Sequence, residues 1–120
     1  MIVDSSVWLE ILFDGKLASA CVRELAKGRI LIPSLVLFEV YKKTKLKTDE
    51  SRALEAVGAI SSHEILELTR EVALLAADLS IEHRMGMADS IVLAHARHLG
   101  TRLITLDHDF AMIPDVSVLR

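Results

Sequence analysis

The sequence has 120 residues, of which 52% are apolar and 26% are charged. This composition is typical of a globular protein with its own core and excludes a disordered chain. A formal net charge of −3 argues weakly against a nucleic-acid partner, although the positions of the charges matter more than their sum. We expect a single domain over residues 1–120, because no linker-like composition divides the chain.

The cysteine content and the length of the apolar segments exclude disulfide-bonded and membrane-spanning proteins. Cys21 is the only cysteine, so neither an intramolecular disulfide nor a cysteine zinc cage is expected. No stretch approaches the roughly 20 apolar residues of a membrane span. The segment from Met1 to Asp4 has neither a basic leader nor a signal-type apolar run. We therefore expect a protein of the reducing cytoplasm with no membrane association.

The first half of the chain predicts two strands and four helices. Residues 1–3 are a short apolar strand that stops at Asp4, and the helix after it ends at Gly15. A second helix fits residues 17–27, and residues 30–32 read as a buried strand. Pro33 suits a helix start, because its missing N–H has no helical partner there. Helices over about 34–45 and 48–60 follow.

The second half predicts three strands and two helices. Residues 65–68 favour a strand, Thr69 caps a helix that runs to His83, and a helix over 87–99 stops at Gly100. Strands are expected at 103–106 and, as an edge strand, at 116–118. Short apolar strands separated by helices are typical of a parallel sheet covered on both faces. The expected fold is α/β, a three-layer α/β/α sandwich with a short, mainly parallel sheet.

Acidic residues occur where the predicted strands end. Asp4 and Asp107 each follow a strand directly, and Asp109 comes two residues later. Glu39 lies in the second turn of the helix that follows strand 30–32. Asp89 interrupts an apolar helix face, so it should point toward the sheet. Because the carboxyl ends of neighbouring parallel strands meet at one edge, we expect these side chains to converge.

Converging carboxylates predict a metal site. Like charges raise the pKa of some members of such a cluster and destabilise it unless a cation is bound. Oxygen ligands without cysteine suit Mg²⁺ or Mn²⁺, and such ions support phosphoryl chemistry. Taken singly, Asp4 and Asp107 are also compatible with simple helix caps, and Glu39 with a solvated helix residue.

Four segments together resemble the PIN-domain family, and within it the small ribonuclease toxins of the VapC type. They are Ile2–Trp8, Ile32–Val40, Met87–Ala96 and Leu103–Phe110, and the resemblance covers nearly the whole chain. It implies a Mg²⁺- or Mn²⁺-dependent endoribonuclease that is the toxin component of a type II toxin–antitoxin system. It also implies an RNA substrate, a small antitoxin partner and a homodimer.

The resemblance also implies which residues form the site. The acids that match the metal and catalytic positions are Asp4, Glu39, Asp89 and Asp107, with Asp109 as a more variable acid beside them. We expect Asp4 and Asp89 to be direct ligands, and the others to hold water molecules or a second ion. Ser5 and Thr105 match supporting hydroxyl residues, and Ser5 is expected to orient the Asp4 carboxylate by hydrogen bonding.

Two surfaces are candidates for partners. Lys42, Lys43 and Lys45 follow Glu39 and are expected to form a phosphate-binding rim, although solvated lysines would give the same pattern. An aromatic content of 4% does not predict base stacking. The apolar surface of the first helix, from Trp8 to Phe13, is expected to be partly core and partly a face for the antitoxin or a second copy.

Other functions fit the pattern less well. A receiver-like phosphoacceptor domain would need paired acids after the first strand, but two serines follow Asp4. An aspartyl phosphatase would need an Asp-x-Asp there, whereas this pattern occurs only at Asp107 and Asp109. A catalytically silent PIN-fold module that binds protein is the alternative from a different class. The retained acids argue against it, because a silent module gains nothing from their repulsion.

Overall fold

Five short parallel strands form one sheet at the centre of the molecule. The computed structural model describes residues 1–120. The strands are β1 (Ile2–Val3), β2 (Leu31–Pro33), β3 (Glu64–Leu66), β4 (Leu103–Thr105) and β5 (Val116–Val118). They lie in the order β3-β2-β1-β4-β5, and every neighbouring pair is parallel. The first strand of the chain is therefore the central strand of the sheet.

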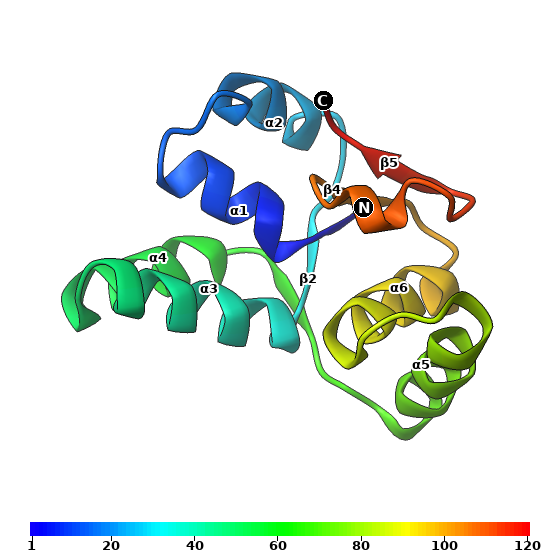
Figure 1. Cartoon of the computed structure of the whole chain (residues 1–120). Helices are drawn as coiled ribbons and strands as arrows, with labels where there is room; N and C mark the ends of the chain where they lie inside the picture. The colour runs from blue at the N-terminus through cyan, green and yellow to red at the C-terminus, as the bar shows by residue number, and fades with distance from the viewer.

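Six α-helices cover this sheet. They are α1 (Ser5–Leu12), α2 (Ala18–Leu25), α3 (Ser34–Lys47), α4 (Glu50–Ile60), α5 (Arg70–His83) and α6 (Met87–Leu99). Helices α5 and α6 pack along each other on one side of the strands, and α1 and α2 lie on the other (Figure 1). Helix α3 packs along α4 and also contacts α1 and α6. The predicted α/β/α arrangement is confirmed. None of the helices is long and apolar enough to span a membrane.

Polar residues at the helix ends explain why the helices begin and end where they do. The side chains of Asp4, Asp49 and Thr69 accept hydrogen bonds from the first turns of α1, α4 and α5. Each bond satisfies one N–H group that has no partner inside the helix. Helix α6 ends at Gly100, which has a φ of 62°, a conformation that glycine adopts without strain.

Strands β1 and β4 are each one residue shorter than predicted, and β2 and β3 are shifted along the chain. Strand β2 lies one residue later than expected and includes Pro33, which is in register with Leu66 of β3. Its φ of −58° and ψ of 138° are extended, so the chain turns into α3 only at Ser34. Strand β3 begins earlier than expected, at Glu64, and ends at Leu66. A short 3₁₀ helix, η1 (His108–Phe110), was not predicted from the sequence.

The core is aliphatic and holds the central strands rigidly. Ile2, Val3 and Ile104 are completely buried, and the burial of each such side chain contributes roughly 1.5–3 kcal/mol. Phe110 is also completely buried and anchors η1 on this core. Cys21 is a buried core residue, as expected. The ends of β1 and β4, where the acidic residues lie, are therefore fixed by packed strands beneath them.

Candidate active site

The register of β1 and β4 places Asp4 beside Thr105. Val3 is in register with Ile104, and the N–H of Asp4 donates to the carbonyl of Ile104 at 3.0 Å. Asp4 is only 5% exposed. Its Oδ1 accepts from the N–H of Ser5 at 2.8 Å, and its Oδ2 accepts from the hydroxyl of Thr105 at 2.8 Å. The buried carboxylate is thus held in one orientation by the first residue of α1 and the last residue of β4.

Ser6 completes this network, although the sequence analysis did not single it out. Its hydroxyl donates to Oδ2 of Asp4 at 3.0 Å and accepts from the N–H of Leu106 at 3.0 Å. The hydroxyls that orient Asp4 therefore belong to Ser6 and Thr105, whereas Ser5 contributes its backbone N–H. The N–H of Asp107 donates to Oγ1 of Thr105 at 3.0 Å, so the predicted supporting role of Thr105 extends to a second acid.

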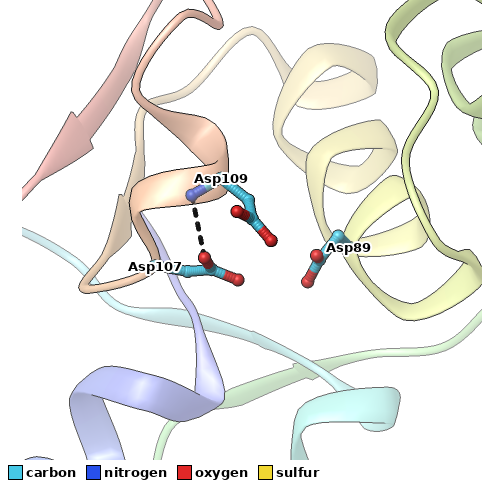
Figure 2. A group of neighbouring side chains, drawn as sticks. All are labelled: Asp89, Asp107 and Asp109. Atoms are coloured by element: carbon cyan, nitrogen blue, oxygen red, sulfur yellow. Dashed lines mark hydrogen bonds between the residues drawn. The ribbon is translucent and has the colours of Figure 1, made fainter.

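A turn brings Asp109 against Asp107. Oδ1 of Asp107 accepts from the N–H of Asp109 at 2.9 Å and caps η1. Asp89 approaches from the first turn of α6, and Figure 2 shows the three carboxylates facing a common space. Oxygen atoms of Asp89, Asp107 and Asp109 all lie within 4.8 Å of one another. The group is therefore built by α6 and by the turn at η1, which are separated in the chain by β4.

Burial and charge repulsion raise the pKa of Asp89 to about 6. Loss of solvent around the carboxylate is the largest cause, followed by the negative charges of Asp107 and Asp4, and then of Glu39 and Asp109. Both effects disfavour the ionised form. Because all four other acids act on it, Asp89 lies electrostatically at the centre of the site.

Glu39 projects into the same region from the second turn of α3. Burial raises its pKa, and the charge of Asp4 raises it further. A hydrogen bond from the Ser5 side chain and the positive charge of Lys43 act in the opposite direction. The Ser5 side chain therefore lies beside Glu39, whereas its backbone N–H is bonded to Asp4.

The donor set fits a divalent cation. Carboxylate oxygens are the preferred ligands of Mg²⁺ and Mn²⁺, and three of them converge within ligand reach of one point. None of the five acids forms an ion pair with a lysine, arginine or histidine. No ion pair therefore neutralises their charge, and a bound cation would reduce the repulsion that, after burial, raises the pKa of Asp89.

Three of the five acids form the closest group. The assignment of Asp4 and Asp89 as direct ligands stays a prediction, and the group within 4.8 Å contains Asp89, Asp107 and Asp109. Asp4 and Glu39 lie outside this group and reach it through their charges. Asp109, expected to be the more variable acid, is one of its three members.

The predicted lysine rim is only partly turned toward the acids. Lys42, Lys43 and Lys45 are all exposed, and Lys43 is the one whose charge acts on Glu39. The ammonium group of Lys42 lies over the ring of Phe38. Lys45 has no comparable influence on the acids. The three lysines therefore extend from the acidic site along α3 instead of surrounding it.

Comparisons with known proteins agree with this fold. The model of the PIN domain family matches residues 1–116, whereas no curated protein matches the sequence significantly. A toxin–antitoxin complex from Klebsiella pneumoniae contains a similar chain, with 26% identity, 98% of this chain and 95% of that chain covered, and a TM-score of 0.81.

Two further solved structures share the fold. VapC20 from Mycobacterium tuberculosis, described as a sarcin–ricin loop cleaving toxin, has 19% identity, a TM-score of 0.81, and coverage of 98% of this chain and 97% of that chain. DNA-bound VapBC from Salmonella typhimurium has 21% identity, a TM-score of 0.78, and coverage of 98% and 95%.

Proposed function

The chain belongs to the PIN domain family, and from this premise we propose that it is a Mg²⁺- or Mn²⁺-dependent endoribonuclease. Residues 1–120 would form a single nuclease domain that hydrolyses RNA phosphodiester bonds. The observation that best supports this proposal is the group of Asp89, Asp107 and Asp109 at the carboxyl edge of the sheet. Burial, followed by the negative charges of the neighbouring acids, raises the pKa of Asp89 to about 6, and a cation would neutralise that charge.

We assign the site residues as follows. The proposed catalytic and metal-binding acids are Asp4, Glu39, Asp89 and Asp107, with Asp109 as a further ligand. Mg²⁺ or Mn²⁺ held by these carboxylates would acidify water and reduce the negative charge of a phosphate. Ser5 supports Glu39, while Ser6 and Thr105 hold Asp4 in one orientation, so that the ligand oxygens need little rearrangement.

The lysines are proposed to hold the substrate backbone. Lys42, Lys43 and Lys45 continue along α3 from Glu39 and are exposed. Their ammonium groups would contact phosphates that flank the one being cleaved, which stabilises the complex and makes binding dependent on salt. Five of the 17 acids belong to the site, so the rest of the chain has 12 acids and 14 basic residues. The overall charge of −3 therefore does not oppose an RNA substrate.

We further propose that the protein is the toxin of a toxin–antitoxin pair. The similar chain from Klebsiella pneumoniae comes from a toxin–antitoxin complex. A hollow of about 220 Å³ between α1, α3 and α4 offers a place for an antitoxin segment, and it is lined partly by Leu12, Phe13 and Ala56. Trp8, by contrast, is buried in the core. Purification from the native cells, followed by mass spectrometry, tests whether a small protein accompanies the chain.

A cytoplasmic location and a homodimer complete the proposal. The lone cysteine is compatible with a reducing compartment. Dimer formation is expected from the family resemblance, and sedimentation of the purified chain tests it. A monomer at all concentrations would remove the dimer from the proposal and leave the nuclease assignment intact.

A cleavage assay tests the main proposal. Labelled structured RNA is incubated with the protein in Mg²⁺, Mn²⁺ or EDTA, and products are separated on a denaturing gel. We expect cleavage with either ion and none in EDTA. Asp4→Asn and Asp89→Asn should each reduce the rate by about 100-fold or more. Removing a metal ligand should lower activity more than removing a residue that only supports a ligand.

The matched control is Asp78→Asn, which removes one acid from the exposed face of α5. It should cleave like the unmodified protein, and circular dichroism should show that all three variants are folded. Undiminished cleavage by both site variants would rule out the assigned residues. Absence of metal-dependent cleavage of any RNA by the unmodified protein would instead favour the catalytically silent binding module.

A further inference from the structure

The outward face of α3 carries two aromatic side chains in line with two lysines. Phe38, Tyr41, Lys42 and Lys45 are spaced three, four and seven residues along the helix, which puts them on one stripe. The stripe lies opposite the buried face of the helix, which contains Val36, Val40 and Thr44. Phe38 is 60% exposed. This ring is therefore not part of the hydrophobic core.

Each aromatic ring on the stripe has an ammonium group close to it. Nζ of Lys42 lies 5.7 Å from the ring centroid of Phe38, and Nζ of Lys45 lies 5.5 Å from that of Tyr41. With Leu46, these four residues line a shallow hollow of about 350 Å³. Both separations are within the range of cation–π attraction, so the stripe contains two copies of the same pairing of a flat apolar surface with a positive charge.

The stripe lies on the same helix as Glu39 of the proposed active site. Phe38 precedes Glu39 directly, and Lys42 precedes Lys43, whose charge acts on Glu39. A polymer that extended from the acidic group along this face of α3 would cross the hollow. An exposed carboxylate near the stripe is that of Glu50, whose Oε1 lies 3.6 Å from Nζ of Lys45. Both partners of this pair are exposed, so the bond is weak and easily exchanged.

We propose that the Phe38–Tyr41 stripe of α3 is a subsite for unpaired nucleotides of single-stranded RNA next to the cleavage site. A nucleotide offers a flat base and an anionic phosphate within a few bonds of each other. The rings would stack against bases, and Lys42 and Lys45 would bind the attached phosphates. This inference rests on the proposed ribonuclease function and deepens it, because it selects single-stranded over duplex RNA. A low overall aromatic content does not prevent stacking where the few rings are gathered.

The charge on the stripe favours RNA over a second copy of the chain. If two copies met through this face, four ammonium groups would be brought together, and like charges that are removed from water repel. An RNA strand has the complementary charge. Self-association through Phe38 remains a separate outcome that the experiment distinguishes.

The test measures binding of a short unstructured RNA in EDTA, so that cleavage plays no part. Fluorescence anisotropy gives the Kd for the unmodified protein and for Phe38→Ala, Phe38→Leu and Phe38→Trp. We expect Kd to rise roughly 5- to 100-fold for the alanine and leucine variants, as for the loss of one stacked base. Phe38→Trp should retain binding. Val22→Ala on α2, where the side chain is 54% exposed, is the control and should bind normally.

Abasic RNA isolates the stacking contact. One base at a time is removed from the RNA. At one position the removal should weaken binding by the unmodified protein, whereas the already weaker binding by Phe38→Ala should not change further. Equal sensitivity of both proteins at every abasic position would overturn the proposal, as would unchanged affinity of Phe38→Ala. A parallel binding series with fully duplex RNA should show little dependence on Phe38.

Two further outcomes keep the inference separate from its premise. If Phe38→Ala shifts sedimentation from dimer to monomer, and its weaker binding does not depend on any base, the stripe is a self-association face and the RNA subsite is wrong. If the unmodified protein shows base-dependent binding through Phe38 but no metal-dependent cleavage, the subsite stands and the ribonuclease proposal fails. If the protein cleaves RNA but replacing Phe38 has no effect on binding, the ribonuclease proposal stands and the subsite is wrong.

Discussion

The hydroxyl of Thr105 at the end of β4 donates a 2.8 Å hydrogen bond to Oδ2 of Asp4 at the end of β1. The same oxygen of Thr105 accepts from the N–H of Asp107 at 3.0 Å. Thr105 is completely buried and Asp4 is 5% exposed, so water has little access to the bond between them. One hydroxyl thus couples two acids of the site through two neighbouring strands.

Replacing Thr105 with valine should therefore affect stability and cleavage together. The change preserves shape but leaves a buried acceptor on Asp4 and a donor on Asp107 without this partner. Such losses cost about 1–3 kcal/mol, which urea unfolding would measure. We expect RNA cleavage at saturating Mg²⁺ to fall about tenfold. Thr105→Ser should recover most of both properties, because it keeps the hydroxyl.

Ser117→Ala on the adjacent strand β5 is the control for this prediction. Ser117 is in register with Ile104 and should tolerate the loss of its hydroxyl with little change in either measurement. If Thr105→Ser were as defective as Thr105→Val, the methyl packing and not the hydrogen bonds would explain the effect.

The raised pKa of Asp89 predicts how stability without metal depends on pH. The pKa of Asp89 rises from an ordinary value of 3.8 to about 6 on folding. Below pH 3.8 the carboxyl is protonated in both states, and the folded protein bears no penalty. Stability is lost as the pH rises toward 6, because the unfolded chain ionises first, and the penalty is complete above that value. Partial solvent exposure limits it to about 1–2 kcal/mol.

Asp89→Asn should therefore be more stable than the unmodified protein at pH 8 in EDTA, and this advantage should vanish near pH 4. Urea unfolding of both proteins at a series of pH values measures the difference in their free energies of unfolding. The pH response of the other carboxylates is common to both proteins and cancels in this difference. A constant difference across the pH range would show that Asp89 ionises normally in the folded protein.

Metal binding should reverse this relationship. A cation that binds only the folded state stabilises it in proportion to the logarithm of its concentration. Adding Mg²⁺ or Mn²⁺ at pH 8 should raise the Tm of the unmodified protein by several degrees, and EDTA should return it. Asp89→Asn should show little increase, whereas Asp78→Asn should respond normally. Equal increases in all three proteins would indicate that the ion binds elsewhere.

The sequence predicted the scaffold of this site better than its contacts. Asp4 and Asp107 follow apolar runs too short for anything but strands, and their convergence required only that the two strands be neighbours, as they are. Asp89 was identified because it interrupts an apolar helix face. These features depend on local periodicity and on the geometry of parallel sheets, both of which a single sequence carries.

The finer arrangement depends on contacts between distant parts of the chain. Ser6 meets Leu106 and Thr105 across about a hundred residues, and nothing in its local pattern separates it from Ser5. The turn at η1 is too short to have a hydrophobic period, although an Asp two residues before a backbone N–H is a known turn former. That turn is what places Asp109 in the closest group.

The lysines of α3 predict a salt-dependent interaction with RNA. Replacing Lys42, Lys43 and Lys45 together with alanine should weaken RNA binding and flatten the plot of log affinity against log salt. Each phosphate contact contributes about 0.7 to that slope for a single strand, so three contacts correspond to a change of about 2. Alanine at Lys16, Arg23 and Lys27, which are also exposed, removes the same charge and is the control. An equal change of slope in both triple variants would mean that only net charge matters, and an unchanged slope for the α3 variant would exclude its lysines from the RNA interface.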